Sequence, residues 1–139
     1  MNDCPFCLLQ HSEPSVIAAN ERAYAVLDIA PIRPGHALVI PRSHVEDFFE
    51  LAPDAQSAML SLANQLAASL KAVCGPLRVG MLVTGFDVAH AHLHVVPIHD
   101  HFDITSRVYL EGRKGVASEE ELQAMRDQLR ERLSASDIA

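Results

Sequence analysis

The stretch HAHLHVVP, His90 to Pro97, decides how the rest of the sequence is interpreted, because it places three histidines at alternate positions. Side chains alternate between the two faces of a β-strand. A strand over Val88 to Pro97 therefore puts the three imidazoles on one face and the intervening apolar side chains on the other. The apolar face suits a core. Packing alone does not explain three imidazoles on one face, since each needs hydrogen-bond partners if it is buried.

A single metal ion shared by His90, His92 and His94 is disfavoured by distance. Alternate Cα atoms of a strand lie ~6.6 Å apart, so the outer two histidines lie ~13 Å apart. Metal–nitrogen bonds are only ~2.0–2.1 Å long, so three such ligands converge only if the strand bends strongly. Imidazole can also act as a nucleophile or as a proton donor near neutral pH. The pattern therefore indicates that the three histidines have different tasks.

The pair Cys4 and Cys7 has the CxxC spacing that holds one metal ion or forms one disulfide. A redox-active pair is expected between a strand and a helix, and no strand is predicted before Cys4, so a metal is favoured. A structural zinc needs two further ligands, and His44 and His90 can supply them. This assignment leaves His92 and His94 available for chemistry.

The other predicted elements run in the order strands, helix, strands, helix, which favours an α+β fold with an antiparallel sheet. Strands are predicted at Val16–Ala19, Ala23–Ile29, His36–Pro41 and Arg78–Val83, with a turn at Asn20-Glu21 and a rigid loop at Pro31–Gly35. Apolar residues at three- and four-residue steps predict a helix from Pro53 to Val73, ended by Gly75-Pro76. An irregular stretch through Gly112–Gly115 precedes a terminal helix, which Ser118 and Glu121 cap and which carries Leu122, Met125, Leu129 and Leu133.

Composition narrows the class of protein. A chain of 139 residues that is 49% hydrophobic suits one compact domain. The formal net charge of −7 argues against a general binder of nucleic acid duplexes. No secretion signal or membrane-spanning run is recognisable, and three cysteines are poor material for a disulfide framework, so a soluble cytoplasmic protein is expected. Cys74 is interpreted as a small buried apolar residue.

HAHLHVV resembles the signature of the histidine triad (HIT) family, in which two apolar residues follow three alternating histidines. LDIAPIRPGHALVIPRSHVEDFFEL, Leu27 to Leu51, is similar to the family's upstream segment, and the resemblance covers roughly Cys4 to His99. It implies a HIT-like fold, a mostly antiparallel sheet of about five strands with two helices. The expected HIT domain spans residues 1–105, with a C-terminal loop and helix at 106–139, and the family is commonly homodimeric.

The resemblance also implies a reaction. The protein is expected to be a nucleotide hydrolase or nucleotidyltransferase that acts at the phosphorus of nucleotide conjugates, either dinucleoside polyphosphates or nucleoside phosphoramidates. His92 would be the nucleophile that forms a nucleotidyl-histidine intermediate, and His94 would contact the phosphate and assist the leaving group. Zinc-containing relatives hold the metal through residues that match Cys4, Cys7, His44 and His90.

Further roles follow by position from the same resemblance. Asp28 would hydrogen-bond the ribose hydroxyls, with Val26, Leu27 and Ile29 near the base, although a turn carboxylate is an alternative for Asp28. His36 matches a histidine common in the family's PGH stretch, and it either hydrogen-bonds near the site or is buried against the backbone. The remaining histidines, His11, His99 and His101, are predicted at the surface, with His99 the expected exception because it follows the triad strand.

The sequence departs from the family at the turn before the triad. Gly85-Phe86-Asp87 stands where many members have Gly-Gln-Ser or Gly-Gln-Thr, and Leu82-Val83 replaces an often-found asparagine. A carboxylate at Asp87 repels a phosphate if it points inward, so either it faces away or the leaving-group chemistry differs. Two alternatives to the enzyme therefore stay open: a nucleotide-binding module with little catalysis, and a metal-dependent hydrolase that uses the triad as ligands.

Overall fold

The computed structural model describes residues 3–104, 110–112 and 115–135. The chain divides into two compact units, Met1–Ile104 and Thr105–Ala139, and each is described here by itself. The predicted boundary between residues 105 and 106 lies outside the described residues. Among the residues that are described, no helix combines the length and the apolar content needed to cross a membrane.

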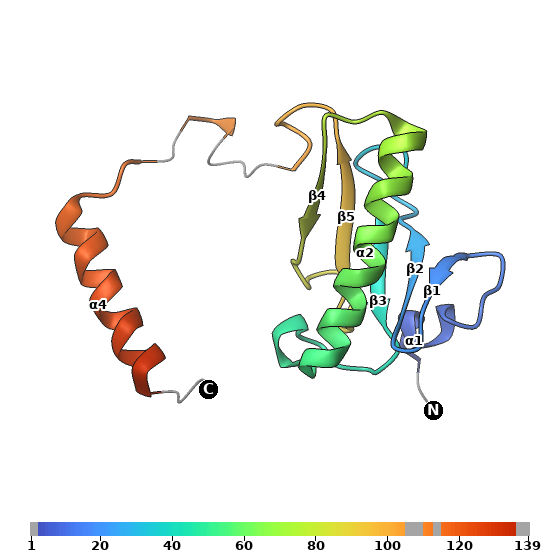
Figure 1. The fold of residues 1–139 in the computed structure, drawn as a ribbon, viewed down its shortest axis with the longest axis horizontal. Coiled ribbons are helices and arrows are strands. Elements are labelled where there is room, and N and C mark those ends of the chain that lie inside the picture. Colours follow the sequence, from blue (N-terminus) through green and yellow to red (C-terminus); the bar gives the residue numbers. More distant parts are fainter. Residues whose placement is uncertain (1–2, 105–109, 113–114, 136–139) are drawn as a thin grey trace. The chain divides into compact units, whose positions relative to one another are not determined.

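Five antiparallel strands form one sheet in the order β1-β2-β3-β5-β4 (Figure 1). Their bounds are β1 Val16–Ala19, β2 Ala23–Leu27, β3 Ala37–Pro41, β4 Arg78–Leu82 and β5 Leu93–Ile98. The central ladder joins β3 to β5, which lie far apart in the sequence, and it pairs Leu38 with His94. This α+β architecture confirms the predicted fold class.

Helix α2, Pro53–Cys74, packs across one face of the sheet (Figure 1) and confirms the predicted central helix. Pro53 occupies its first turn, where a missing N–H costs nothing, and Gly75 ends it in the left-handed conformation. The buried row of the helix is Ala55, Met59, Leu62, Ala63, Leu66 and Leu70. Ala91, Leu93 and Val95 join the same core, so the apolar side of the triad segment packs as predicted.

The opposite face of the sheet carries a second buried cluster, built on Tyr24, Val26, Leu38 and Ile40. A short helix that was not predicted, α1 at Pro5–Leu9, adds Phe6 to this cluster. The Tyr24 hydroxyl donates to the Phe6 carbonyl oxygen, and burial raises the pKa of Tyr24, which keeps the hydroxyl a donor. Five residues are too few to show a helical period, so hydrophobic periodicity does not predict α1.

The predicted strand over Val88–Pro97 is wrong in its first half, because β5 begins only at Leu93. The His90 N–H donates to the Val88 carbonyl, and the Ala91 N–H donates to Val45 beyond the end of β3. These hydrogen bonds replace a regular ladder before Leu93. His90 and His92 therefore lie on a bent segment, and only His94 lies on the strand.

Three smaller boundaries also differ from the prediction. β2 ends at Leu27, not Ile29, because the Asp28 carboxylate accepts the Ala30 N–H at 2.8 Å and turns the chain. β3 begins one residue after His36 and β4 ends at Leu82. A 3-10 helix, η1 at Phe48–Glu50, adds to the predicted elements.

The second unit contains helix α4, Glu119–Ala135. The Ser118 hydroxyl accepts the Glu121 N–H at 3.1 Å, which confirms the Ser118 side of the predicted capping box. Residues 113–114 of the predicted irregular stretch, and the side chain of Leu133, lie outside what the structure describes.

Candidate functional site

His90 is the first of the three triad histidines and is completely buried. Its Nε2–H donates to the Pro41 carbonyl oxygen at 2.8 Å. In a neutral imidazole this leaves Nδ1 without a proton. That bare nitrogen lies 3.3 Å from Cys4 Sγ, 3.5 Å from Cys7 Sγ and 3.2 Å from His44 Nδ1.

The four side chains around this point are the predicted zinc ligands. Cys7 Sγ lies 3.3 Å from His44 Nδ1, and all four ligand atoms lie within 4.8 Å of one another. A tetrahedral zinc with bonds of ~2.3 Å to sulfur and ~2.0–2.1 Å to nitrogen separates its ligand atoms by roughly 3.3–3.8 Å. The donor set and its spacing therefore fit a zinc ion. The hydrogen bond from His90 to Pro41 is the outer contact that orients a histidine ligand.

His92 has the opposite arrangement of ring nitrogens. Its Nδ1–H donates to the His90 carbonyl oxygen at 2.8 Å, so the lone pair of the neutral ring is on Nε2. The side chain is only 3% exposed, and the Phe6 ring packs edge-on against it with 5.1 Å between centroids. A neutral imidazole held through one nitrogen presents the other as a nucleophile.

His94 is oriented through a second histidine, His36. The Ile32 N–H donates to His36 Nδ1 at 3.0 Å, so the proton of a neutral His36 is on Nε2. His36 Nε2 lies 2.9 Å from His94 Nδ1 and donates to it, which leaves the proton of a neutral His94 on Nε2. Burial lowers the pKa of both histidines, and this favours their neutral forms at pH 7. His36 therefore makes one hydrogen bond to the main chain, at Ile32, and another to the side chain of His94.

Asp28 lies beside both histidines. Its Oδ2 is 3.5 Å from His36 Nε2 and 4.0 Å from His94 Nδ1. The other oxygen, Oδ1, accepts the Ala30 N–H at 2.8 Å, which confirms the turn interpretation of Asp28. Asp28, His36 and His94 are close enough to bind a metal. However, the Ile32 N–H occupies His36 Nδ1 and puts the proton on Nε2, the atom that would have to coordinate. The arrangement therefore favours a hydrogen-bonded group over a metal site at this point.

A cavity of about 480 Å³ opens beside these groups. His92, His94 and Asp28 line its polar side. Its apolar walls come from three places in the chain: Pro5, Phe6 and Leu9 of α1, Val26, Leu27 and Ile29 at the end of β2, and Leu38 with Val88. The residues from β2 had been predicted near a nucleobase, whereas the α1 wall was missed. The CxxC spacing is the feature of the sequence that could have indicated this wall. A metal held by Cys4 and Cys7 beside the triad also brings Phe6, which lies between them, to the site.

Asp87 lines the same cavity, so the alternative in which it faces away from the site is wrong. Its charge acts to raise the pKa of His94, against the larger lowering by burial and by the neighbouring histidines. Phe86, in contrast, is 90% exposed. The cavity therefore contains a carboxylate at the position where the resemblance implies a serine or threonine.

The residues left outside the site are placed largely as predicted. His11 and His101 are exposed, and His99 is partly buried. Cys74 is also only partly buried and packs against the core, with its Sγ 3.6 Å from the Pro34 carbonyl oxygen.

Comparison with known proteins places this arrangement in a family. The HIT domain matches residues 10–101. An uncharacterised HIT-like protein of Mycoplasma genitalium is 37% identical over 106 residues, which cover 71% of this chain and 75% of that protein. An adenylylsulfatase of Arabidopsis thaliana is 28% identical over 103 residues, covering 69% of this chain and 52% of that protein.

A solved structure with the same fold is that of a zinc-bound histidine triad family protein of Mycobacterium smegmatis. It has a TM-score of 0.64 and 27% identity, and the match covers 96% of this chain and 97% of that one. The HIT domain match spans more than half of the chain and includes β2, β3 and the whole histidine segment. The protein is therefore a member of the HIT family.

Proposed function

We propose that the protein is a zinc-containing nucleotide hydrolase or nucleotidyltransferase that acts at the phosphorus of nucleotide conjugates, with His92 as the nucleophile. The observation that carries this proposal is the hydrogen bond from His92 Nδ1–H to the His90 carbonyl oxygen. It leaves the Nε2 lone pair for attack, on a ring that borders a cavity shared with His94 and Asp28.

The reaction has two steps. In the first, a bond forms between His92 Nε2 and phosphorus, and the bond from phosphorus to the leaving group breaks; the electron pair departs with the leaving group, and an amine leaving group takes up a proton from solvent. The positive charge on the His92 ring is stabilised by its Nδ1–H bond to a carbonyl oxygen. In the second, water forms the new P–O bond, the P–N bond breaks, and the water proton is released. With another acceptor in place of water the same intermediate gives transfer.

His94 is proposed to donate its Nε2–H to a phosphate oxygen or to the leaving-group atom. A donor held at this place stabilises the negative charge that builds up as the bond breaks. His36 positions it by donating to His94 Nδ1. Asp28 is proposed to accept ribose hydroxyls, and the apolar walls from α1 and β2 to contact the base. The similarity to an adenylylsulfatase supports an adenylyl group on the nucleotide side.

The test of the nucleophile is to trap it. We expect incubation with adenosine 5′-phosphoramidate and rapid acid-free quenching to show an adenylyl mass on the tryptic peptide that contains His92. The adduct is expected to be absent from His92→Ala and to accumulate in His94→Asn. Turnover of the conjugate by His92→Ala at the wild-type rate would overturn the proposal.

Zinc is proposed to be held by Cys4, Cys7, His44 and His90, which ties α1 to the end of β3 and to the triad segment. Metal analysis is expected to give about one zinc per chain. Cys4→Ser and His44→Ala should lose the metal, whereas His92→Ala and the matched cysteine control Cys74→Ser should keep it. Loss of zinc from His92→Ala would show that the triad itself is the metal site.

A binding module with little catalysis is the second candidate, and the observation that favours it is Phe86-Asp87 at the positions where the resemblance implies Gln-Ser or Gln-Thr. Without those polar donors, the negative charge that builds up on the phosphate in the transition state is less stabilised. Tight binding of AMP without turnover of phosphoramidate, dinucleoside polyphosphate or adenylyl sulfate would select this candidate. A homodimer, common in the family, is proposed as well, and sedimentation equilibrium measures it directly.

A further inference from the structure

Arg33 lies in the loop between β2 and β3, and its side chain reaches a turn that follows β5. Its Nε donates to Asp103 Oδ1 at 2.8 Å, and one terminal nitrogen donates to Asp100 Oδ2 at 3.2 Å. The Asp103 side chain is only 7% exposed. Because β5 carries His94 and the β2–β3 loop leads into His36, this contact joins the two segments that hold the histidine pair.

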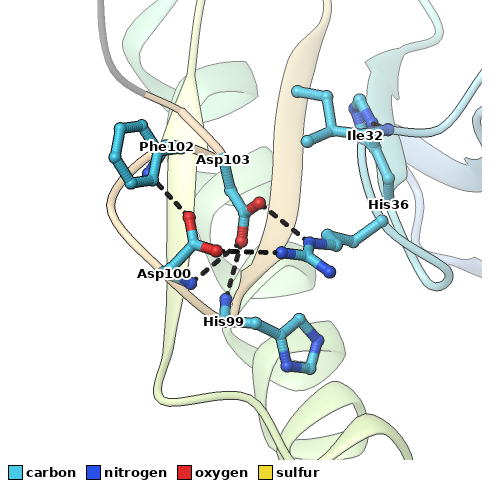
Figure 2. A network of polar contacts seen from close by, with 7 residues as sticks. Ile32, His36, His99, Asp100, Phe102 and Asp103 are labelled. Atoms are coloured by element: carbon cyan, nitrogen blue, oxygen red, sulfur yellow. Dashed lines mark hydrogen bonds and ion pairs between the residues drawn. The ribbon is translucent and has the colours of Figure 1, made fainter. Parts of the chain in front are cut away.

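The Asp103 carboxylate accepts hydrogen bonds at both of its oxygens. Its Oδ2 accepts the His99 N–H at 2.8 Å and the Asp100 N–H at 3.2 Å. The backbone N–H of His99 and the Arg33 guanidinium lower the pKa of Asp103 to about 2. The carboxylate is therefore charged throughout the neutral range, and both of its oxygens are occupied by groups from the two segments (Figure 2).

The main chain next to Arg33 contacts His36 on two sides. The Ile32 N–H donates to His36 Nδ1, and the Arg33 carbonyl oxygen accepts the His36 N–H at 3.0 Å. The first of these bonds decides where the protons of the histidine pair lie. With the Ile32 N–H in place, His36 donates from Nε2 to His94 Nδ1, and His94 keeps its proton on Nε2.

Without the Ile32 hydrogen bond, the pair can reverse. A proton on His36 Nδ1 makes its Nε2 an acceptor, so His94 donates from Nδ1 and its Nε2 loses the proton. His94 then faces the cavity as an acceptor and repels a phosphate oxygen. The position of the loop therefore sets the direction of the hydrogen bond between the two histidines.

We propose that Arg33 and Asp103 are positioning residues, which hold the β2–β3 loop so that the Ile32 N–H keeps His36 and His94 in the tautomers that make His94 Nε2–H a donor. The residues act through His36 and do not touch the substrate. This inference rests on the proposed function for its kinetic consequence, but its structural consequence can be measured without any substrate.

The test compares Arg33→Ala and Asp103→Asn with a matched control, Arg22→Ala. Arg22 also pairs with an aspartate, Asp54 at 2.9 Å, but at the β1–β2 turn and outside this network. The first measurement is long-range ¹H–¹⁵N correlation NMR of histidine side chains in the zinc-loaded full chain. We expect the wild type and Arg22→Ala to show His94 protonated at Nε2, and Arg33→Ala to show averaged or reversed nitrogen shifts for His36 and His94.

The second measurement is the kinetics on two AMP conjugates, a phosphoramidate of an alkylamine and a p-nitrophenyl ester. Because a poor leaving group depends more on the His94 donor, Arg33→Ala should lower kcat on the phosphoramidate on the order of 10- to 100-fold. The kcat of Arg33→Ala on the ester should fall much less, and KM for either conjugate should change little. Arg33→Lys, which keeps the charge, should recover part of kcat.

Wild-type histidine shifts in Arg33→Ala would overturn this inference, whatever its activity. Equal losses of kcat on both conjugates would also overturn it, because they indicate a general loss of structure. If His92→Ala leaves turnover unchanged while the histidine shifts respond to Arg33→Ala, the proposed function fails and the positioning role stands.

Discussion

At the scale of single residues, three histidines of one short segment differ because each has a different hydrogen-bond partner. His90 donates from Nε2 to the Pro41 carbonyl oxygen, and His92 donates from Nδ1 to the His90 carbonyl oxygen. His94 accepts at Nδ1 from the His36 ring. A bare Nδ1 beside two thiols suits a metal, a bare Nε2 suits a nucleophile, and an Nε2–H suits a donor to phosphate.

Asp87 gives a first prediction at this scale. Asp87→Asn removes a negative charge from the cavity, so AMP should bind on the order of 3- to 10-fold more tightly, with less effect at high salt. Isothermal titration calorimetry at two ionic strengths measures this change. Glu13→Gln, an exposed residue with the same change of net charge, should leave the affinity unaltered. Weaker binding by Asp87→Asn would contradict the repulsion.

The buried histidines predict a dependence of stability on pH. Burial lowers the pKa of His36 and His94, so below pH ~6.5 the unfolded chain binds more protons than the folded one. Their contribution is fully present above the unfolded pKa, and it is lost as the pH falls through that value. Urea unfolding between pH 7.5 and 5.5 should show this decline. The free energy of unfolding should fall less steeply with decreasing pH in His36→Asn than in the wild type. An equal dependence on pH would contradict the contribution of His36.

At the scale of elements, the loop before β3 is held against the end of α2 by a glycine. Gly35 has φ +99, and a Cβ there would lie 2.9 Å from Cys74 Sγ and 3.0 Å from Leu70 Cδ2. The close approach and the positive φ both require glycine at this point. The loop that carries Arg33 and the chain leading to His36 is thereby fixed to the core.

Substitution of this glycine tests the contact. Gly35→Ala combines backbone strain with a clash, and should lower the free energy of unfolding by about 2–4 kcal/mol. Gly75→Ala at the helix end has a positive φ as well, but nothing lies within 4 Å of its Cβ, so only about 1–2 kcal/mol is expected. Urea denaturation of both variants measures the difference. Equal losses would show that the contact with Cys74 and Leu70 is unimportant.

At the scale of the first unit, the sheet separates a hydrophobic core from the site. α2 and the apolar side of the triad segment form the core on one face, while α1, the histidines and the cavity lie on the other. The central β3–β5 ladder connects the two sides. The core can therefore be weakened without a direct contact to the site being removed.

Leu62→Ala tests this separation. Leu62 is buried beneath the sheet, so the substitution should lower the free energy of unfolding by about 2–5 kcal/mol. Leu60→Ala, at a largely exposed position of the same helix, should cost less than about 1 kcal/mol. The folded Leu62→Ala protein should keep its zinc content and its affinity for AMP, and loss of either under native conditions would show that the two faces are coupled.

The sequence by itself determined the order of the five strands and of helices α2 and α4, the start of α2 at Pro53, and the four candidate zinc ligands Cys4, Cys7, His44 and His90. These depend on local periodicity, on turn residues and on ligand spacing, which a single chain displays directly. The tertiary structure alone decided that β5 begins at Leu93, that α1 forms a wall of the cavity and that Asp87 faces into it. It also decided the proton positions on the histidines, through carbonyl and N–H groups of Pro41 and Ile32, and the contact between Arg33 and Asp103. Each of these depends on a contact between segments far apart along the chain, or on which main-chain group faces a side chain, and no residue pattern encodes such contacts.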